Sequence, residues 1–374
     1  MSIHHEDDLQ NSSASPHPPL ESLGWDANWA KQFGPFGEQG LVPARVTCEH
    51  REAYDVAGAP GTLRAEISGR FRHAHPQHTD WPAVGDWVAM APRPEEGAAT
   101  IHAVLARRSR FSRKAAGART EEQVVAANVD VVFLVTSLDG DFNLRRIERY
   151  LTVAWDSGAR PVIVLNKADL CADVDARIAE VENIAFGAPV AALSAATGHG
   201  LEALGALLTP GMTGAFLGSS GVGKSSLVNA LLGTVRQTTQ AVRADDSRGR
   251  HTTTNRELIP LPGGALIIDT PGMRELQIWA DEDGLDTTFS DVEALASQCR
   301  FRDCTHTREP GCAVRAALED GTLEPDRFRS YAKLQREIEY QELRQEQSAR
   351  VIEKRRWKKV AQEIRRIERN KGNR

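Results

Sequence analysis

The chain has 374 residues, of which 41% are hydrophobic and 26% charged, and its formal net charge is −5. This is the composition of an ordinary folded protein, and the length suffices for two or three domains. The sequence excludes a membrane protein, because no apolar run in it approaches the length of a membrane helix. Residues 1–20 lack the apolar centre of a secretory signal, so we expect a cytoplasmic protein without a membrane partner.

The charge is unevenly distributed. Residues 350–374 hold eleven basic and three acidic side chains, so this end carries +8 and the rest of the chain −13. A basic arm on an acidic body indicates an anionic partner that the arm contacts. A solvated helix, or a helix that packs on a partner protein, is the alternative.

The elements expected in the first third of the chain are short. Residues 1–36 contain several prolines and few aliphatic side chains, which predicts disorder. Residues 37–118 contain strand-like runs separated by Gly, Pro and Asp. Five such runs in this length are typical of a small β-barrel, so we predict an RNA-binding OB-fold domain here. The runs are residues 44–47, 62–65, 69–72, 85–88 and 100–104.

Residues 119–280 have a different pattern, in which buried strands alternate with helices. This alternation predicts a parallel α/β sheet. The apolar runs are residues 131–135, 161–165, 190–193, 214–217 and 265–268, with helical stretches at 144–154 and 224–232. Pro262-Gly263-Gly264 predicts a hairpin between 257–259 and 265–267. We expect a mostly helical Cys/His domain at 281–334 and a basic helix at 335–374.

A phosphate-binding loop is predicted between one of these strands and the helix that follows it. Its sequence, G-S-S-G-V-G-K-S, matches the loop pattern at every fixed position. The glycines let backbone N–H groups face the phosphates, Lys224 can reach the β- and γ-phosphate oxygens, and Ser225 can ligate Mg²⁺. A Gly/Ser turn that only caps a helix is the alternative, which the strand–loop–helix context disfavours. The predicted nucleotide-binding residues are Gly218, Ser219, Ser220, Gly221, Val222, Gly223, Lys224, Ser225 and Ser226.

A guanine-reading motif, Asn166-Lys167-Ala168-Asp169, precedes this loop in the chain. The Asp169 carboxylate can accept two hydrogen bonds from guanine, whereas adenine offers no donor at those positions. Asn166 can brace the pocket, the Lys167 stem can cover the ring, and Ser194 and Ala195 would supply backbone amides to the guanine oxygen. An Asx turn that starts a helix is the alternative for the motif alone. In an ordinary GTPase the phosphate loop comes first, so this chain enters and leaves the pocket at unusual points.

Two switch segments are predicted beyond the phosphate loop. Asp269-Thr270-Pro271-Gly272 ends a strand about 45 residues after the loop. There Asp269 can hold Mg²⁺ through water and the Gly272 amide can sense the γ-phosphate. Between them, residues 249–254 include three threonines, of which we favour Thr253 as a Mg²⁺ ligand, with its neighbours left open. A polar exposed loop is the alternative for this stretch.

The residue after Gly272 is Met273, where many GTPases carry a glutamine that orients the attacking water. A thioether cannot orient water, so intrinsic turnover should be slow. His251 is the candidate catalytic group, because an imidazole can orient or accept a proton from water. The predicted catalytic set is therefore His251, Lys224 and Thr253.

A metal site is predicted from Cys299, Cys304, His306 and Cys312. Three thiolates and one imidazole fill a tetrahedral shell, which is typical of structural Zn²⁺ and leaves no position for catalysis. Unrelated free cysteines are the alternative. The remaining cysteines, Cys48 and Cys171, are expected to be isolated thiols.

Two surfaces are candidates for RNA binding, the basic C-terminal arm and the barrel. OB-folds bind nucleic acid with aromatic side chains ringed by cations. Phe71 and Trp87 have an equally favoured alternative as core residues. The other candidate residues are Arg70, Arg72, Trp81, Arg107, Arg108, Arg110, Phe111, Arg113 and Lys114.

This combination of motifs, over about residues 40–335, resembles the RsgA (also YjeQ) family of circularly permuted GTPases. The motifs that carry it are the guanine motif ahead of the phosphate loop, the Gly-Arg-His-Thr-Thr-Thr sequence at 249–254, the preceding barrel and the following Cys/His cluster. The resemblance implies hydrolysis of GTP to GDP and phosphate, stimulated by the small ribosomal subunit, and a late role in maturing that subunit. It also implies Mg²⁺, one structural Zn²⁺ and contacts with ribosomal RNA, and we expect a monomer.

The main alternative is an RNA-binding assembly scaffold in which the nucleotide is mainly structural. A permuted GTPase of the large subunit is more remote. The reversed motif order also suggests a movement. The chain leaves the second switch for the Cys/His segment, so the γ-phosphate should change the spacing between that segment and the barrel.

Overall fold

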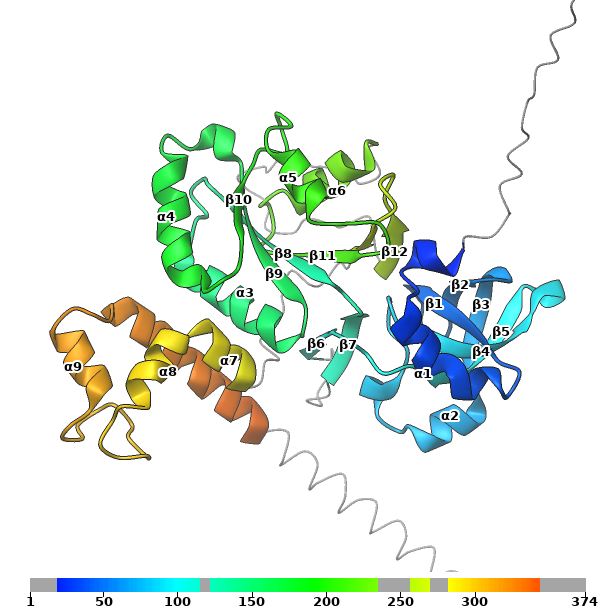
Figure 1. The fold of residues 1–374 in the computed structure, drawn as a ribbon, viewed down its shortest axis with the longest axis horizontal. Helices are drawn as coiled ribbons and strands as arrows, with labels where there is room; N and C mark the ends of the chain where they lie inside the picture. Colours follow the sequence, from blue (N-terminus) through cyan, green and yellow to red (C-terminus); the bar gives the residue numbers. More distant parts are fainter. Residues whose placement is uncertain (1–18, 115–121, 235–255, 270–281, 344–374) are drawn as a thin grey trace, which may run out of the picture.

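The computed structural model describes residues 19–114, 122–234, 256–269 and 282–343 (Figure 1). One sheet of eleven strands runs through this described part, in the order β10-β9-β8-β11-β13-β12-β1-β2-β3-β5-β4. The first six of these strands belong to an α/β unit and the last five to a barrel. The two units therefore share backbone hydrogen bonds where β12 meets β1.

The α/β unit confirms the predicted parallel sheet. Strands β10, β9, β8, β11 and β13 are parallel neighbours, and β12 runs antiparallel to β13 through the predicted hairpin. Every residue of β8 is buried, because helices cover both faces of a parallel sheet. The elements are β8 (Val131–Ser137), α3 (Leu144–Asp156), β9 (Arg160–Asn166), η4 (Ala168–Leu170), α4 (Val174–Ala185), β10 (Val190–Ala192), α5 (Leu201–Ala206), β11 (Thr213–Leu217), α6 (Lys224–Leu232), β12 (Arg256–Pro260) and β13 (Leu266–Asp269).

The barrel closes because β1 pairs with both β2 and β4. Its five strands, counted in the described residues, are β1 (Val42–Glu49), β2 (Tyr54–Gly58), β3 (Gly61–Ile67), β4 (Trp87–Arg93) and β5 (Ala98–Val104). Short 3-10 turns η2 (His78–Asp80) and η3 (Pro94–Glu96) lie between them. Burial alternates along β3, so its apolar side chains face the barrel interior.

One predicted barrel strand is wrong. Residues 69–72 belong to helix α2 (Gly69–Ala74), which starts where the Ser68 side chain accepts a hydrogen bond from the Phe71 amide. Phe71 and Trp87 are buried, so the alternative of core residues holds for both. The fifth strand is β2, which the sequence pattern did not indicate.

The N-terminal segment also differs from its prediction. Disorder was expected for 1–36, but residues 20–37 form η1 (Leu20–Leu23) and α1 (Ala27–Gly37). Asp26 caps α1 by accepting from two backbone amides. Trp29 is 2% exposed and packs 6.3 Å from the Trp87 ring. A few large apolar side chains thus order a segment of polar composition, while residues 1–18 lie outside the described part.

A hairpin of β6 (Arg110–Lys114) and β7 (Glu122–Ala127) connects the barrel to the α/β unit. The Cys/His segment follows at the other end and packs against α3 (Figure 1). It consists of α7 (Glu282–Thr288), α8 (Ser290–Ala296), α9 (Ala313–Glu319) and a helix at 325–343. Packing is close, since a Cβ on Gly284 would lie 2.4 Å from the Thr152 carbonyl oxygen of α3. No described helix is long and apolar enough to cross a membrane.

Candidate nucleotide site

The predicted nucleotide-binding residues gather at one edge of the α/β sheet. The guanine motif follows β9, Ser194 and Ala195 follow β10, the phosphate loop follows β11, and Asp269 ends β13. These four strands and β8 are parallel neighbours, so their carboxyl ends meet along this edge. Ligands of open α/β sheets bind at such an edge.

The phosphate loop depends on glycines with no room for a side chain. A Cβ on Gly218 would lie 2.2 Å from the Val135 carbonyl oxygen, and one on Gly223 would lie 2.2 Å from Asn166 Nδ2. Gly223 also has a φ of 97°, a left-handed conformation that favours glycine. Helix α6 begins at the next residue, Lys224, so its free N–H groups point back into the loop.

Asn166 joins the three parts of the pocket. Its Nδ2 donates to the Val222 carbonyl in the phosphate loop at 2.7 Å, and its Oδ1 accepts from the Ala195 amide at 3.0 Å. The Asn166 side chain is buried, and both ends of its amide are hydrogen-bonded. The guanine motif, the phosphate loop and the Ser194–Ala195 turn are therefore fixed relative to one another by one side chain.

Lys167 and Asp169 lie further out on the same motif. Lys167 has a left-handed φ of 62°, and its Nζ donates to Asp139 Oδ2 at 2.7 Å. Burial would raise the pKa of Asp139, but hydrogen bonds from Lys167, the Asp141 amide and Ser137 outweigh it and lower that pKa to about 2. Asp139 therefore stays charged and holds the Lys167 stem in place. Asp169 is exposed within η4, where a base can reach it.

Sequence reasoning missed Asp139 and Tyr150. Asp139 stands just after β8, the strand between the two motif-bearing strands, and this position was the available signal. Tyr150 lies on α3, and its hydroxyl is 3.3 Å from Ser219 Oγ in the phosphate loop. Tyr150 and Ser219 are 69 residues apart in the chain, so no sequence spacing relates them, and only the folded α/β unit brings them together.

Known proteins share this architecture. A family model described as RsgA GTPase matches residues 104–279. A protein of Opitutus terrae named "Small ribosomal subunit biogenesis GTPase RsgA" is 54% identical over 94% of this chain and 99% of its own. A protein of the same name from Syntrophotalea carbinolica is 46% identical over 95% of this chain and 99% of its own. The chain belongs to the RsgA family.

Solved structures agree with this membership. The crystal structure of YjeQ from Thermotoga maritima is 30% identical with a TM-score of 0.60, over 80% of this chain and 98% of that one. The structure of YloQ, described as a circularly permuted GTPase, is 25% identical with a TM-score of 0.56, over 80% of this chain and 95% of that one. This RsgA-family member is thus a circularly permuted P-loop GTPase that hydrolyses GTP.

Only two of the predicted Mg²⁺ ligands of this RsgA-family GTPase lie in the described residues. Ser225 lies in the first turn of α6, and Asp269 ends β13, the neighbour of the strand that leads into the phosphate loop. A hydroxyl and a carboxylate are the hard oxygen donors that Mg²⁺ prefers, so this donor set fits the ion. His251, Thr253, Gly272 and Met273 lie outside the described residues.

The Cys/His cluster has the geometry of a metal site. The donor atoms of Cys299, Cys304, His306 and Cys312 all lie within 4.8 Å of one another. Cys299 Sγ is 3.6 Å from His306 Nδ1 and 3.9 Å from Cys312 Sγ, and Cys312 Sγ is 3.5 Å from His306 Nδ1. Donors around tetrahedral Zn²⁺ are roughly 3.5–3.8 Å apart. Cys299, His306 and Cys312 therefore have the spacing of zinc ligands, and Cys304 lies within reach as the fourth.

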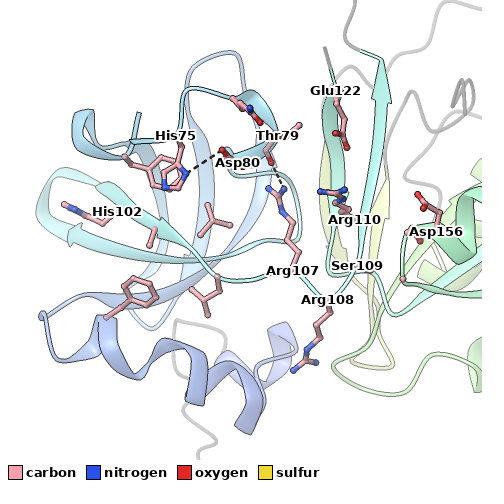
Figure 2. A pocket seen from close by; sticks show the side chains of 18 residues that line it. His75, Thr79, Asp80, His102, Arg107, Arg108, Ser109, Arg110, Glu122 and Asp156 are labelled. Carbon is pink, nitrogen blue, oxygen red and sulfur yellow. Dashed lines mark hydrogen bonds and ion pairs between the residues drawn. The ribbon is translucent and has the colours of Figure 1, made fainter. Parts of the chain in front are cut away.

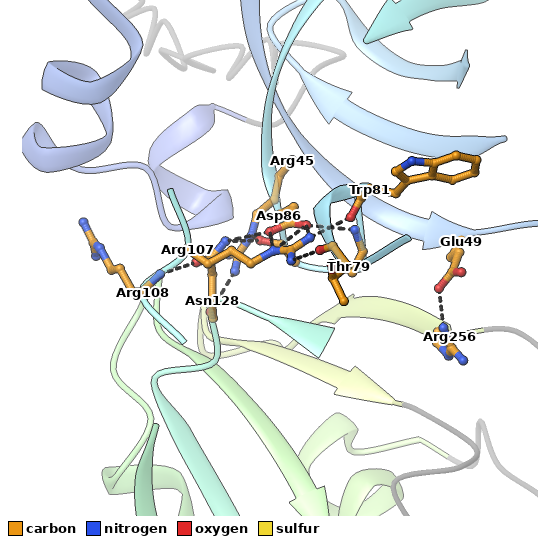
Figure 3. Close-up of polar contacts among 11 residues, drawn as sticks. Arg45, Glu49, Thr79, Trp81, Asp86, Arg107, Arg108, Asn128 and Arg256 are labelled. Atoms are coloured by element: carbon orange, nitrogen blue, oxygen red, sulfur yellow. Dashed lines mark hydrogen bonds and ion pairs between the residues drawn. The ribbon is translucent and has the colours of Figure 1, made fainter. Parts of the chain in front are cut away.

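Two of the predicted RNA-binding cations are structural. Arg107 forms an ion pair with the buried Asp86 at 2.7 Å and donates to the Thr79 and Trp81 carbonyls (Figure 3). Arg108 pairs with Asp26 and stacks 4.3 Å from the Trp29 ring. Both arginines hold parts of this protein together, so the dense run of cations is weaker evidence for RNA than its sequence indicated.

A cavity of about 1020 Å³ lies between the barrel and the hairpin of β6 and β7 (Figure 2). His75 and His102 line it from the barrel, and Arg110 and Asp156 from the far side. None of the predicted nucleotide-binding residues is among those that line it.

Proposed function

We propose that this GTPase binds the small ribosomal subunit, hydrolyses GTP when the subunit stimulates it, and assists late maturation of that subunit. The observation that carries this proposal is the Asn166 side chain, which joins a guanine-reading motif to a phosphate loop. The names of the two curated relatives support the ribosomal role. A partner of this kind places the protein in the cytoplasm, and we expect it to act as a monomer.

In the proposed site, Asp169 reads guanine while the loop amides and Lys224 hold the phosphates. Ser225, Thr253 and Asp269 would hold Mg²⁺, which when bound neutralises charge on the β- and γ-phosphates. Gly272 would sense the γ-phosphate. Lys224 Nζ donates to the Gly218 and Ser219 carbonyls of the loop, so its ammonium group already lies at the loop that receives the phosphates.

We assign the positioning of the attacking water to His251, since Met273 cannot do it. His251→Ala should leave GTP affinity nearly unchanged and abolish hydrolysis stimulated by small subunits. Equilibrium binding of a fluorescent GTP analogue and single-turnover hydrolysis measure the two effects separately. Normal stimulated turnover in the variant would remove His251 from the mechanism.

The domain layout is proposed as an OB-fold RNA-binding domain at 37–118, the permuted GTPase domain at 119–280, a zinc-binding domain at 281–334 and a basic helix at 335–374. A structural Zn²⁺ on Cys299, Cys304, His306 and Cys312 would cross-link the third of these. Arg110 and Arg113 of β6, together with the basic residues of 350–374, are the cations proposed to face RNA. Binding to ribosomal RNA should then weaken as salt rises.

The experiment that tests the function is GTP hydrolysis with and without purified small subunits, for the natural chain and for Lys224→Ala. The proposal predicts stimulation by the subunit that the variant loses while subunit binding persists. Equal turnover with and without subunits, combined with tight subunit binding, would favour the assembly scaffold. Stimulation by large subunits instead would point to the other ribosomal particle.

A further inference from the structure

The seam between the barrel and the α/β sheet contains a row of chemically reactive side chains. Cys48 of β1 stands directly opposite Asp55 of β2 on one side and Glu257 of β12 on the other. Residues paired across neighbouring strands share a face of the sheet, with Cβ atoms roughly 4.5–5.5 Å apart. The thiol therefore has a carboxylate on each side.

His50 adds a third kind of donor to this face. It lies two residues after Cys48, just past the end of β1. Its Nε2 is 2.8 Å from Asp55 Oδ2. The donor atoms of Cys48, His50 and Asp55 all lie within 4.8 Å of one another. Cys48, which was expected to be an isolated thiol, is a free cysteine with an imidazole and a carboxylate close to it.

The charges around the thiol favour a cation. Burial raises the pKa of Cys48, and the carboxylates of Asp55 and Glu257 raise it further, with Arg64 acting in the opposite direction. Arg64 binds Asp55 through Oδ1 at 2.8 Å. Arg64 thus orients the carboxylate while Oδ2 faces His50, as a supporting residue does for a metal ligand.

We propose that Cys48, His50 and Asp55 form a second site for a zinc-class divalent ion. One thiolate, one imidazole and one carboxylate form a donor set that borderline metals accept. An ion here would link β1 to β2 beside β12. The site is separate from the Cys/His cluster, which consists of other residues at the far end of the molecule (Figure 1).

Strand pairing connects this proposed site to the nucleotide site. Glu257 is paired not only with Cys48 but also, on its other side, with Asp269 of β13. An ion beside Cys48 would therefore lie one strand away from Glu257 and two strands away from the proposed Mg²⁺ ligand Asp269. A plain ion-pair cluster of His50, Asp55 and Arg64 is the competing explanation, and it binds no metal.

Native mass spectrometry of the full chain, with added Zn²⁺ and weak competing chelator, decides between them. We expect two ions on the natural chain and one on Cys48→Ser and on His50→Gln. Cys304→Ser should lose the other ion, and the matched control Cys171→Ser should keep both. The double variant His4→Gln/His5→Gln tests whether the adjacent histidines near the start of the chain bind an ion, and it should also keep both ions. Two ions on Cys48→Ser, or a single ion on the natural chain that only Cys304→Ser removes, would overturn the proposal.

A Co²⁺ titration provides a second readout that does not depend on fold stability. With the Cys/His cluster already filled by Zn²⁺, Co²⁺ bound to the Cys48 thiolate should give near-ultraviolet charge-transfer absorption. Cys48→Ser should abolish this absorption, and His50→Gln should weaken Co²⁺ binding by at least about 10-fold. Absorption that is unchanged in Cys48→Ser would contradict the assignment. Circular dichroism of each variant checks that it folds, and GTP turnover is not needed for either result.

Discussion

The barrel and the Cys/His segment are attached to the α/β unit in different ways. At the barrel, β1 continues the sheet, and the buried Arg45 donates to the carbonyl oxygens of Leu23, Gly85 and Asn128 and to Thr213 Oγ1 (Figure 3). The Cys/His segment shares no strand with the sheet in the described residues, and it contacts helix α3 and Phe186 at the end of α4. There the buried Arg327 donates to Glu148 of α3, Asp291 and the Thr288 carbonyl.

We expect the barrel and the Cys/His segment to differ in how freely they move relative to the α/β unit. The barrel cannot shift at this junction without breaking the pairing of Cys48 and Glu49 with β12 and the hydrogen bonds of Arg45, whereas a contact borne by a helix can move with that helix. Helix α3 also carries Tyr150, which contacts the phosphate loop, and Arg149, which pairs with Glu337 at 2.7 Å. We infer that the barrel and the α/β unit move as one body, and that α3 transmits changes at the nucleotide to the Cys/His segment.

Removal of Zn²⁺ should have the largest effect on this contrast. Metal-binding free energy is folding free energy in small metal domains, on the order of 10 kcal/mol. Cys304→Ser, which removes this ion and leaves the proposed barrel site in place, should therefore unfold much of 282–343 and leave the barrel junction intact. Amide hydrogen exchange of the natural chain and the variant measures both regions in one experiment. Equal loss of protection in the barrel would contradict a separate attachment.

The substitution Arg327→Ala should have the next largest effect. It leaves the fully buried Glu148 with Arg145 as its remaining cation, and losing one partner of a buried pair costs up to about 3–5 kcal/mol. The effect should appear as early release of 282–343 in urea, followed by limited proteolysis. The control is Arg329→Ala, which removes an exposed pair with Asp326 and should change stability by less than about 0.5 kcal/mol. Similar losses in both variants would show that the buried pair is not the anchor.

Arg45→Met should cost less, about 1–3 kcal/mol, and should act on the whole molecule. Its carbonyl partners lose a donor, but the cost of burying a charge also disappears. Burial lowers the pKa of Arg45, which Asp130 and Asp86 partly offset, to about 10, so the group is charged at neutral pH. Barrel and α/β unit should still unfold in one transition. Two separate transitions would mean that Arg45, and not the shared sheet, joins them.

Tyr150→Phe should have the smallest effect on stability, below about 1 kcal/mol, because one neutral hydrogen bond is lost. Its informative effect is on coupling. GTP-analogue binding should no longer change hydrogen exchange in α7, while affinity changes by less than about 5-fold. Unchanged exchange coupling would exclude Tyr150 from the path between loop and segment.

Local sequence patterns were sufficient to predict the strands of the α/β unit and its hairpin, since continuous apolar runs and Gly-rich turns determine them. The same patterns failed where tertiary contacts decide the structure. Residues 69–72 look like a strand but form a helix that Ser68 caps, and Trp29 orders a segment of polar composition by packing on the barrel. Of the described site residues, the loop and the guanine motif were predicted from spacing. Asp139 and Cys48 were not, because their partners come from neighbouring strands.

The most direct test of the central claim is a set of three distances measured by electron paramagnetic resonance. Each spin label would be attached to a non-natural amino acid, so that the natural cysteines do not react. The labelled positions are the exposed residues Glu95 of the barrel, Glu182 of α4 and Arg302 of the Cys/His segment. Distances are compared with GDP and with a non-hydrolysable GTP analogue, on and off the small subunit. The 95–182 distance should stay constant while the 95–302 distance changes with the γ-phosphate. A constant 95–302 distance, or a nucleotide-dependent 95–182 distance, would contradict the claim.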